Sequence, residues 1–74
     1  MTEESITKTL EEGLNIMIEA LDSNSPRRWA VGQGAYDGAV AAANLKGVNV
    51  SDYKAKSDKL VEIAKGKGFY ILER

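Results

Sequence analysis

The segment from Ala30 to Ala43 is built largely from small side chains, and this constrains the fold more than any other feature. It holds three glycines and six alanines, which contribute little volume to a hydrophobic core. Each glycine inside a helix costs about 1 kcal/mol relative to alanine. Ser25-Pro26 is nevertheless a strong helix start, and Gly47 is a suitable helix end. We therefore expect a helix from Pro26 to Gly47, with Gly32–Gly34 as the place where it would break.

Apolar periodicity predicts two further helices. Residues 2–23 carry an apolar residue at every third or fourth position, with Thr2 as N-cap. Residues 51–68 repeat the pattern more weakly, with Ser51 as N-cap and two glycines at the end. The apolar stripe of the first of these helices consists of Ile6, Leu10, Leu14, Met17 and Leu21.

The three helices predict an all-α fold, a compact three-helix domain that spans residues 1–74. A chain of this length is expected to form one domain. The apolar tail is expected to be tied down, either as a clasp over the helices or as a minor strand pairing of 48–50 with 69–72.

Composition excludes several kinds of chemistry. The chain has no cysteine and no histidine, which removes disulfides, thiolate metal sites and the usual general base. No cluster of serine, lysine and carboxylate side chains replaces them, so we predict no enzyme activity, no metal and no cofactor. The acidic N-terminus and the lack of a long apolar run predict a cytoplasmic protein without a membrane partner. A core this small favours stabilisation by oligomerisation.

The small residues of the second helix form two adjacent ridges when they are taken in steps of four. One ridge starts at Ala30 and the other at Val31. Together the two ridges form a flat helix face of small side chains. The first helix carries Gly13 on its apolar stripe, so this small-residue face is expected to pack against that helix inside one chain. Alternatively, it meets the same face of a second copy across a twofold axis. A third interpretation, a phosphate-binding Gly-Gln-Gly loop, has only a weak motif behind it. The candidate interface residues are Gly13, Ala30, Gly34, Ala35, Gly38, Ala39 and Ala42.

Arg27-Arg28-Trp29 opens the second helix, where the helix dipole disfavours positive charge. Two guanidinium groups, free backbone N–H groups and an indole predict a site for an anion or an acidic partner. In the alternative interpretation, the arginines pair with Glu19 or Asp22 and Trp29 anchors the core.

The third helix is basic, and Lys56 and Lys59 are further candidates for binding an anion or a partner. Acidic residues alternate with these lysines, so the alternative is an ordinary solvated helix face. Charge is also uneven along the chain: residues 1–22 hold six acidic and one basic side chain, and residues 23–74 hold five acidic and nine basic ones.

These observations predict a small non-enzymatic helical interaction module, acting as a regulator, inhibitor or accessory protein. Its expected partners are a second copy of itself, through the Gly/Ala-rich face, and another protein. The alternative function is nucleotide or nucleic-acid binding through the Arg-Arg-Trp helix start and the basic third helix.

Overall fold

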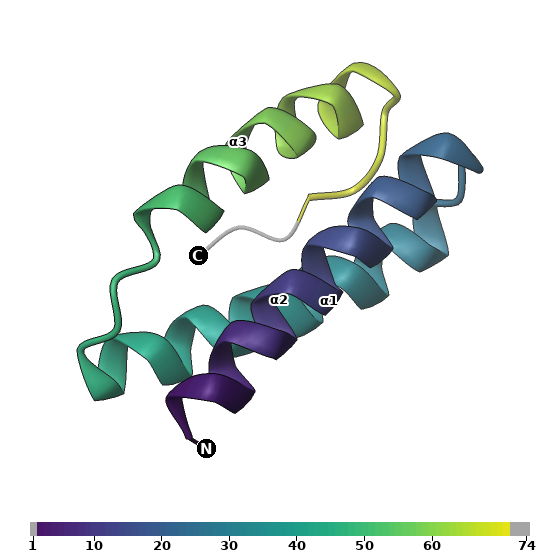
Figure 1. Ribbon diagram of the computed structural model, residues 1–74. Coiled ribbons are helices and arrows are strands. Elements are labelled where there is room, and N and C mark those ends of the chain that lie inside the picture. The colour runs from purple at the N-terminus through teal and green to yellow at the C-terminus, as the bar shows by residue number, and fades with distance from the viewer. Residues whose placement is uncertain (1, 72–74) are drawn as a thin grey trace.

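The computed structural model describes residues 2–71 of the chain (Figure 1). Three α-helices follow one another: α1 (Glu3–Asp22), α2 (Pro26–Lys46) and α3 (Ser51–Gly66). The predicted all-α, three-helix fold is confirmed. Among the described residues there is no strand, so residues 48–50 and 69–71 do not form the strand pairing considered above. Residue 72, the last of that predicted strand, lies outside the described range.

Short-range signals place most of the helix ends. The Thr2 hydroxyl accepts a hydrogen bond from the Ser5 backbone N–H at 3.1 Å, and the Ser25 hydroxyl accepts one from Arg28 N–H at 3.2 Å. Gly47 ends α2 in the left-handed conformation, with φ of 70°. At α3 the predicted cap is wrong, because Ser51 is the first helical residue and its N–H donates to the Asn49 side chain at 2.9 Å.

α2 runs through Gly32–Gly34 without a break, and its contact with α1 explains two of the glycines. A Cβ atom at Gly13 would lie 2.9 Å from the Tyr36 backbone nitrogen. A Cβ atom at Gly32 would lie 2.9 Å from the Met17 backbone nitrogen. Both distances are too short for a side chain, so the two helices cross closely at these two points. The predicted close crossing at Gly13 is therefore confirmed.

The ridge of α2 that meets α1 differs from the expectation. Its buried residues include Trp29, Gly32, Tyr36, Ala39 and Ala43, whereas Ala30, Gly34 and Gly38 are exposed. The reason is hydrophobic: Trp29 and Tyr36 are the two aromatic residues of α2, and burying both in the core turns the opposite side of the helix outward.

The core lies mainly between α1 and α2. Its largest fully buried side chains are Trp29, Ile6, Leu10 and Met17. Phe69, beyond α3, packs on Trp29 with the ring centroids 6.3 Å apart, so the tail does act as a clasp at this residue. α3 approaches α1, but within the described range no Cα atom of α3 comes within 8 Å of one in α2. α3 packs on the α1–α2 pair through its side chains, because Ala64 is buried in the core and Tyr53, Leu60 and Val61 pack against it.

Candidate functional site

The outward side of α2 presents a continuous uncharged surface, which we call the outer face. Gly34 and Gly38 lie at its centre, and an added Cβ atom at either would meet no atom within 4 Å. Two large apolar side chains flank them, Val31 with 59% of its surface exposed and Leu45 with 90%. The outer face consists of Ala30, Val31, Gly34, Gly38, Ala42 and Leu45.

The predicted interface residues therefore divide into three groups by exposure. Ala30, Gly34 and Gly38 are exposed, while Ala35 and Ala42 are half-buried at the sides of α2. Gly13 and Ala39 are buried between α1 and α2, so neither is available to a partner. Their small size serves the close helix crossing inside the chain.

A hollow of about 380 Å³ lies beside the N-terminal end of the outer face. Ile16 and Val31 supply its apolar part, and the Arg27 and Arg28 side chains border it. Arg28 is held by Glu19, with its Nη2 donating to Oε2 at 3.0 Å, as the ion-pair interpretation predicted. Arg27 makes no ion pair with any residue between 2 and 71. Among these residues it is an unpaired cation at the positive, N-terminal end of the α2 dipole.

Trp29 cannot contribute to an anion site at this surface. The residue is fully buried, and its indole N–H donates to the Gln33 side-chain oxygen at 2.9 Å. Its predicted role of stacking on a ligand is thus not available in this fold. The alternative, that Trp29 anchors the core, describes the structure correctly.

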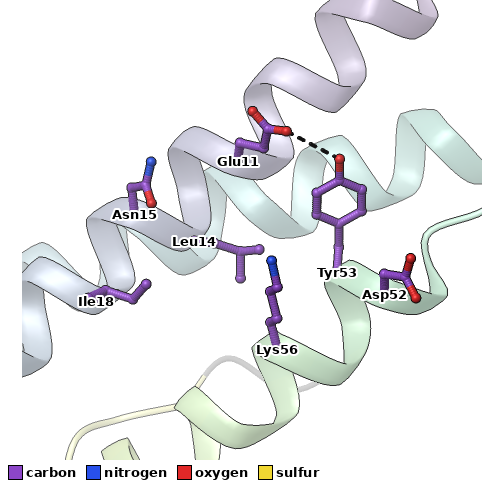
Figure 2. Close-up of a pocket in the computed structure, with 7 residues that line it drawn as sticks. All are labelled: Glu11, Leu14, Asn15, Ile18, Asp52, Tyr53 and Lys56. Atoms are coloured by element: carbon purple, nitrogen blue, oxygen red, sulfur yellow. Dashed lines mark hydrogen bonds between the residues drawn. The ribbon is translucent and has the colours of Figure 1, made fainter.

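The two candidate lysines of α3 lie away from the arginines. Lys59 is exposed, and Lys56 borders a cleft of about 410 Å³ between α1 and α3 (Figure 2). In this cleft Lys56 lies near Leu14, while Glu11 and Asp52 add two acidic groups. A mixture of charges does not favour an anion. The hollow bordered by Arg27 and Arg28 includes no lysine of α3, and the cleft bordered by Lys56 includes no arginine of α2.

One hydrogen bond crosses the same cleft and links α1 to α3. The Tyr53 hydroxyl donates to Oε1 of Glu11 at 3.4 Å (Figure 2). Partial burial and the negative charge of Glu11 raise the pKa of Tyr53 above its usual 10.0. The contact is long and exposed, so it positions α3 only weakly.

A groove of about 570 Å³ separates α2 from α3 on the other side. Tyr36 and Ser57 lie in it as buried residues, and within residues 2–71 no atom makes a hydrogen bond with the Tyr36 hydroxyl. Burial raises the pKa of Tyr36, the nearby Ser57 hydroxyl lowers it, and the Asp58 and Asp37 carboxylates raise it further.

Sequence reasoning missed several residues that these surfaces bring forward. Leu45 follows Arg27 by 18 residues, which is five helical turns, so the spacing alone would have placed both on one line. For Ile16 and Tyr36, no comparable spacing in the sequence indicates that they border these surfaces. Their positions depend on how α1 and α3 pack against α2.

Comparisons with known proteins add no relative. No protein-family model, no curated protein and no solved structure matches this chain significantly. Within the described residues, no group of three or more acidic side chains is arranged to hold a metal ion. None of the helices in that range has the length and apolar character needed to cross a bilayer.

Proposed function

We propose that this chain is a small non-enzymatic interaction module that associates with a second copy of itself through the outer face of α2. The observation that carries the proposal is the position of Gly34 and Gly38. Both lie inside a helix, where glycine costs about 1 kcal/mol each, and both face open space. Packing within one chain gives no reason for them, whereas close approach of another helix does.

The outer face is self-complementary in an antiparallel arrangement. A twofold axis at the level of Tyr36 places Gly34 opposite Gly38 of the second copy, and Ala30 opposite its Ala42. The four small residues are thus symmetric about one point on the helix. The two α2 helices approach closely at the glycines, and their dipoles oppose each other favourably.

The same axis brings Leu45, which is 90% exposed, to a hollow. Leu45 of one copy lies opposite Arg27 of the other, beside the hollow floored by Ile16 and Val31. Arg27 then lies near the negative C-terminal end of the second α2, where a cation is stabilised. Its aliphatic stem adds apolar contact to Leu45. One partner therefore buries the exposed Leu45 side chain and places the Arg27 charge near the opposite end of a helix dipole.

A concentration series in the analytical ultracentrifuge tests the proposal. The unmodified protein should sediment as a dimer whose dissociation constant changes little with added salt. Leu45→Glu should weaken association about 100-fold, because two buried leucines at about 1.5 kcal/mol each are lost. Gly34→Leu should also give a monomer. Ile63→Glu is the matched control, since Ile63 is 50% exposed on α3, and it should leave the dimer intact.

The outcome that refutes self-association is a single-chain mass for the unmodified protein at every concentration up to millimolar. Binding of nucleic acid or nucleotides is the weaker alternative, because Trp29 is buried and Arg28 is paired with Glu19. It predicts binding that weakens steeply with salt and is lost in Arg27→Ala/Arg28→Ala.

A further inference from the structure

The hollow beside the start of α2 has an aliphatic lining that is open to solvent. Its volume is about 380 Å³, and it lies between the half-buried Ile16 of α1 and the exposed Val31 of α2. A concave apolar surface bordered by a few charged groups is the usual form of a small-molecule site. The lining therefore favours a ligand with an aliphatic part.

The charge around the same hollow is unbalanced. Arg27 and Arg28 border it, and among residues 2–71 no acidic side chain lines it. Glu19, which pairs with Arg28 at 3.0 Å, lines a neighbouring hollow together with Asp22. Arg27 has no ion-pair partner between residues 2 and 71, and the α2 dipole adds to its positive charge. The rim of the hollow therefore favours an anion.

A ligand that satisfies both features is an aliphatic chain that ends in a carboxylate. Inorganic phosphate has no apolar part to cover Ile16 and Val31, and a neutral hydrocarbon leaves the Arg27 charge without a partner. A nucleotide base needs an aromatic surface for stacking, and Trp29, the aromatic residue nearest in sequence, is fully buried. The Arg27 guanidinium, by contrast, matches the geometry of a carboxylate and donates two hydrogen bonds to it.

We propose that this hollow binds a fatty acid of short or medium chain, with the aliphatic part on Ile16 and Val31 and the carboxylate on Arg27. In the proposed dimer the same hollow receives Leu45 of the second copy. The fatty acid and the second copy then compete, and the ligand regulates self-association. The competition rests on the proposed function, whereas binding of the fatty acid to a single chain does not.

Titration of sodium octanoate into the Leu45→Glu chain tests binding without the dimer. The methyl resonances of Ile16 and Val31 should shift and reach saturation. Butanoate should bind at least about tenfold more weakly, because its shorter chain covers less of the aliphatic lining. Arg27→Gln should weaken octanoate binding about threefold to fivefold, the scale of an exposed ion pair. Lys59→Gln is the matched control, since Lys59 is an exposed cation of α3, and it should leave binding unchanged.

Three results would overturn the site: no saturable shift with octanoate, equal affinity in Arg27→Gln, or binding of neutral octanol as tight as that of octanoate. Sedimentation of the unmodified protein tests the competition. Saturating octanoate should convert the dimer to single chains, and a dimer that persists with octanoate bound would overturn the regulatory role. An unmodified protein that binds octanoate but never dimerises would refute self-association and confirm the fatty-acid site.

Discussion

Replacement of Gly13 by alanine isolates the contact that determines how α1 and α2 pack. The new methyl group would lie 2.9 Å from the Tyr36 nitrogen and 3.0 Å from its Cα atom. Both are backbone atoms of a helix, so neither can rotate away as a flexible side chain would. Relief requires the two helices to separate along the whole interface.

The magnitude follows from two opposing effects. Alanine in place of glycine favours the helix by about 1 kcal/mol. Overpacking against backbone costs about 1–3 kcal/mol, and a rigid neighbour places this contact at the upper end. We therefore expect Gly13→Ala to lower the free energy of unfolding by about 1–2 kcal/mol. Gly38→Ala, where the methyl group meets open space within one chain, should raise it by about 1 kcal/mol when both changes are made in a Leu45→Glu chain, in which the proposed dimer is weakened.

Urea unfolding at micromolar concentration, followed by Trp29 fluorescence, measures both changes. The comparison is internal, because the two substitutions are chemically identical and both lie inside helices. Thermal midpoints should move in opposite directions, by about 4–8 °C per kcal/mol for a domain of this size. A Gly13→Ala protein as stable as the unmodified chain, or more stable, would refute the close-crossing argument.

Two further predictions concern single side chains. Arg28→Ala should lower the free energy of unfolding by no more than about 1 kcal/mol, because the Arg28 and Glu19 side chains are 56% and 61% exposed. Urea unfolding measures this change, and a loss above about 2 kcal/mol would contradict a surface ion pair. Tyr36→Phe should flatten the alkaline limb of the stability curve. The pKa of Tyr36 is raised in the folded state, so its hydroxyl supports stability below pH 10 and that support is lost as pH rises through the folded pKa. Thermal midpoints between pH 8 and 11 check this, and parallel curves for the two proteins would contradict it.

The helices and most of their ends were predictable because their signals are local. Thr2, Ser25 and Gly47 act within one turn of backbone, so neighbouring residues suffice to predict them. The start of α3 was misplaced by one residue, since Val50 is the N-cap and makes no side-chain hydrogen bond, while the Asn49 side chain accepts the N–H of Ser51. Gly13 was also predictable, because a glycine on an apolar stripe has few uses other than close packing.

The candidate surfaces were predicted only in part. The small-residue ridge starting at Ala30 was found from its spacing, but its neighbours Leu45 and Ile16 were not connected with it. The anion site was predicted from adjacent residues, and burial of Trp29 removed one of its three members. Adjacent residues on a helix point in different directions, so proximity in sequence does not make a site.

The sequence by itself determined that this chain forms three helices and where α1 and α2 begin and end, because capping and apolar period are short-range effects. Tertiary structure alone decided which side of α2 faces inward. α2 has small or apolar residues on every side, so its periodicity does not distinguish an inner from an outer face. Burial of Trp29 and Tyr36 in the core made that choice, and it left Gly34, Gly38 and Leu45 exposed as the surface we propose for self-association.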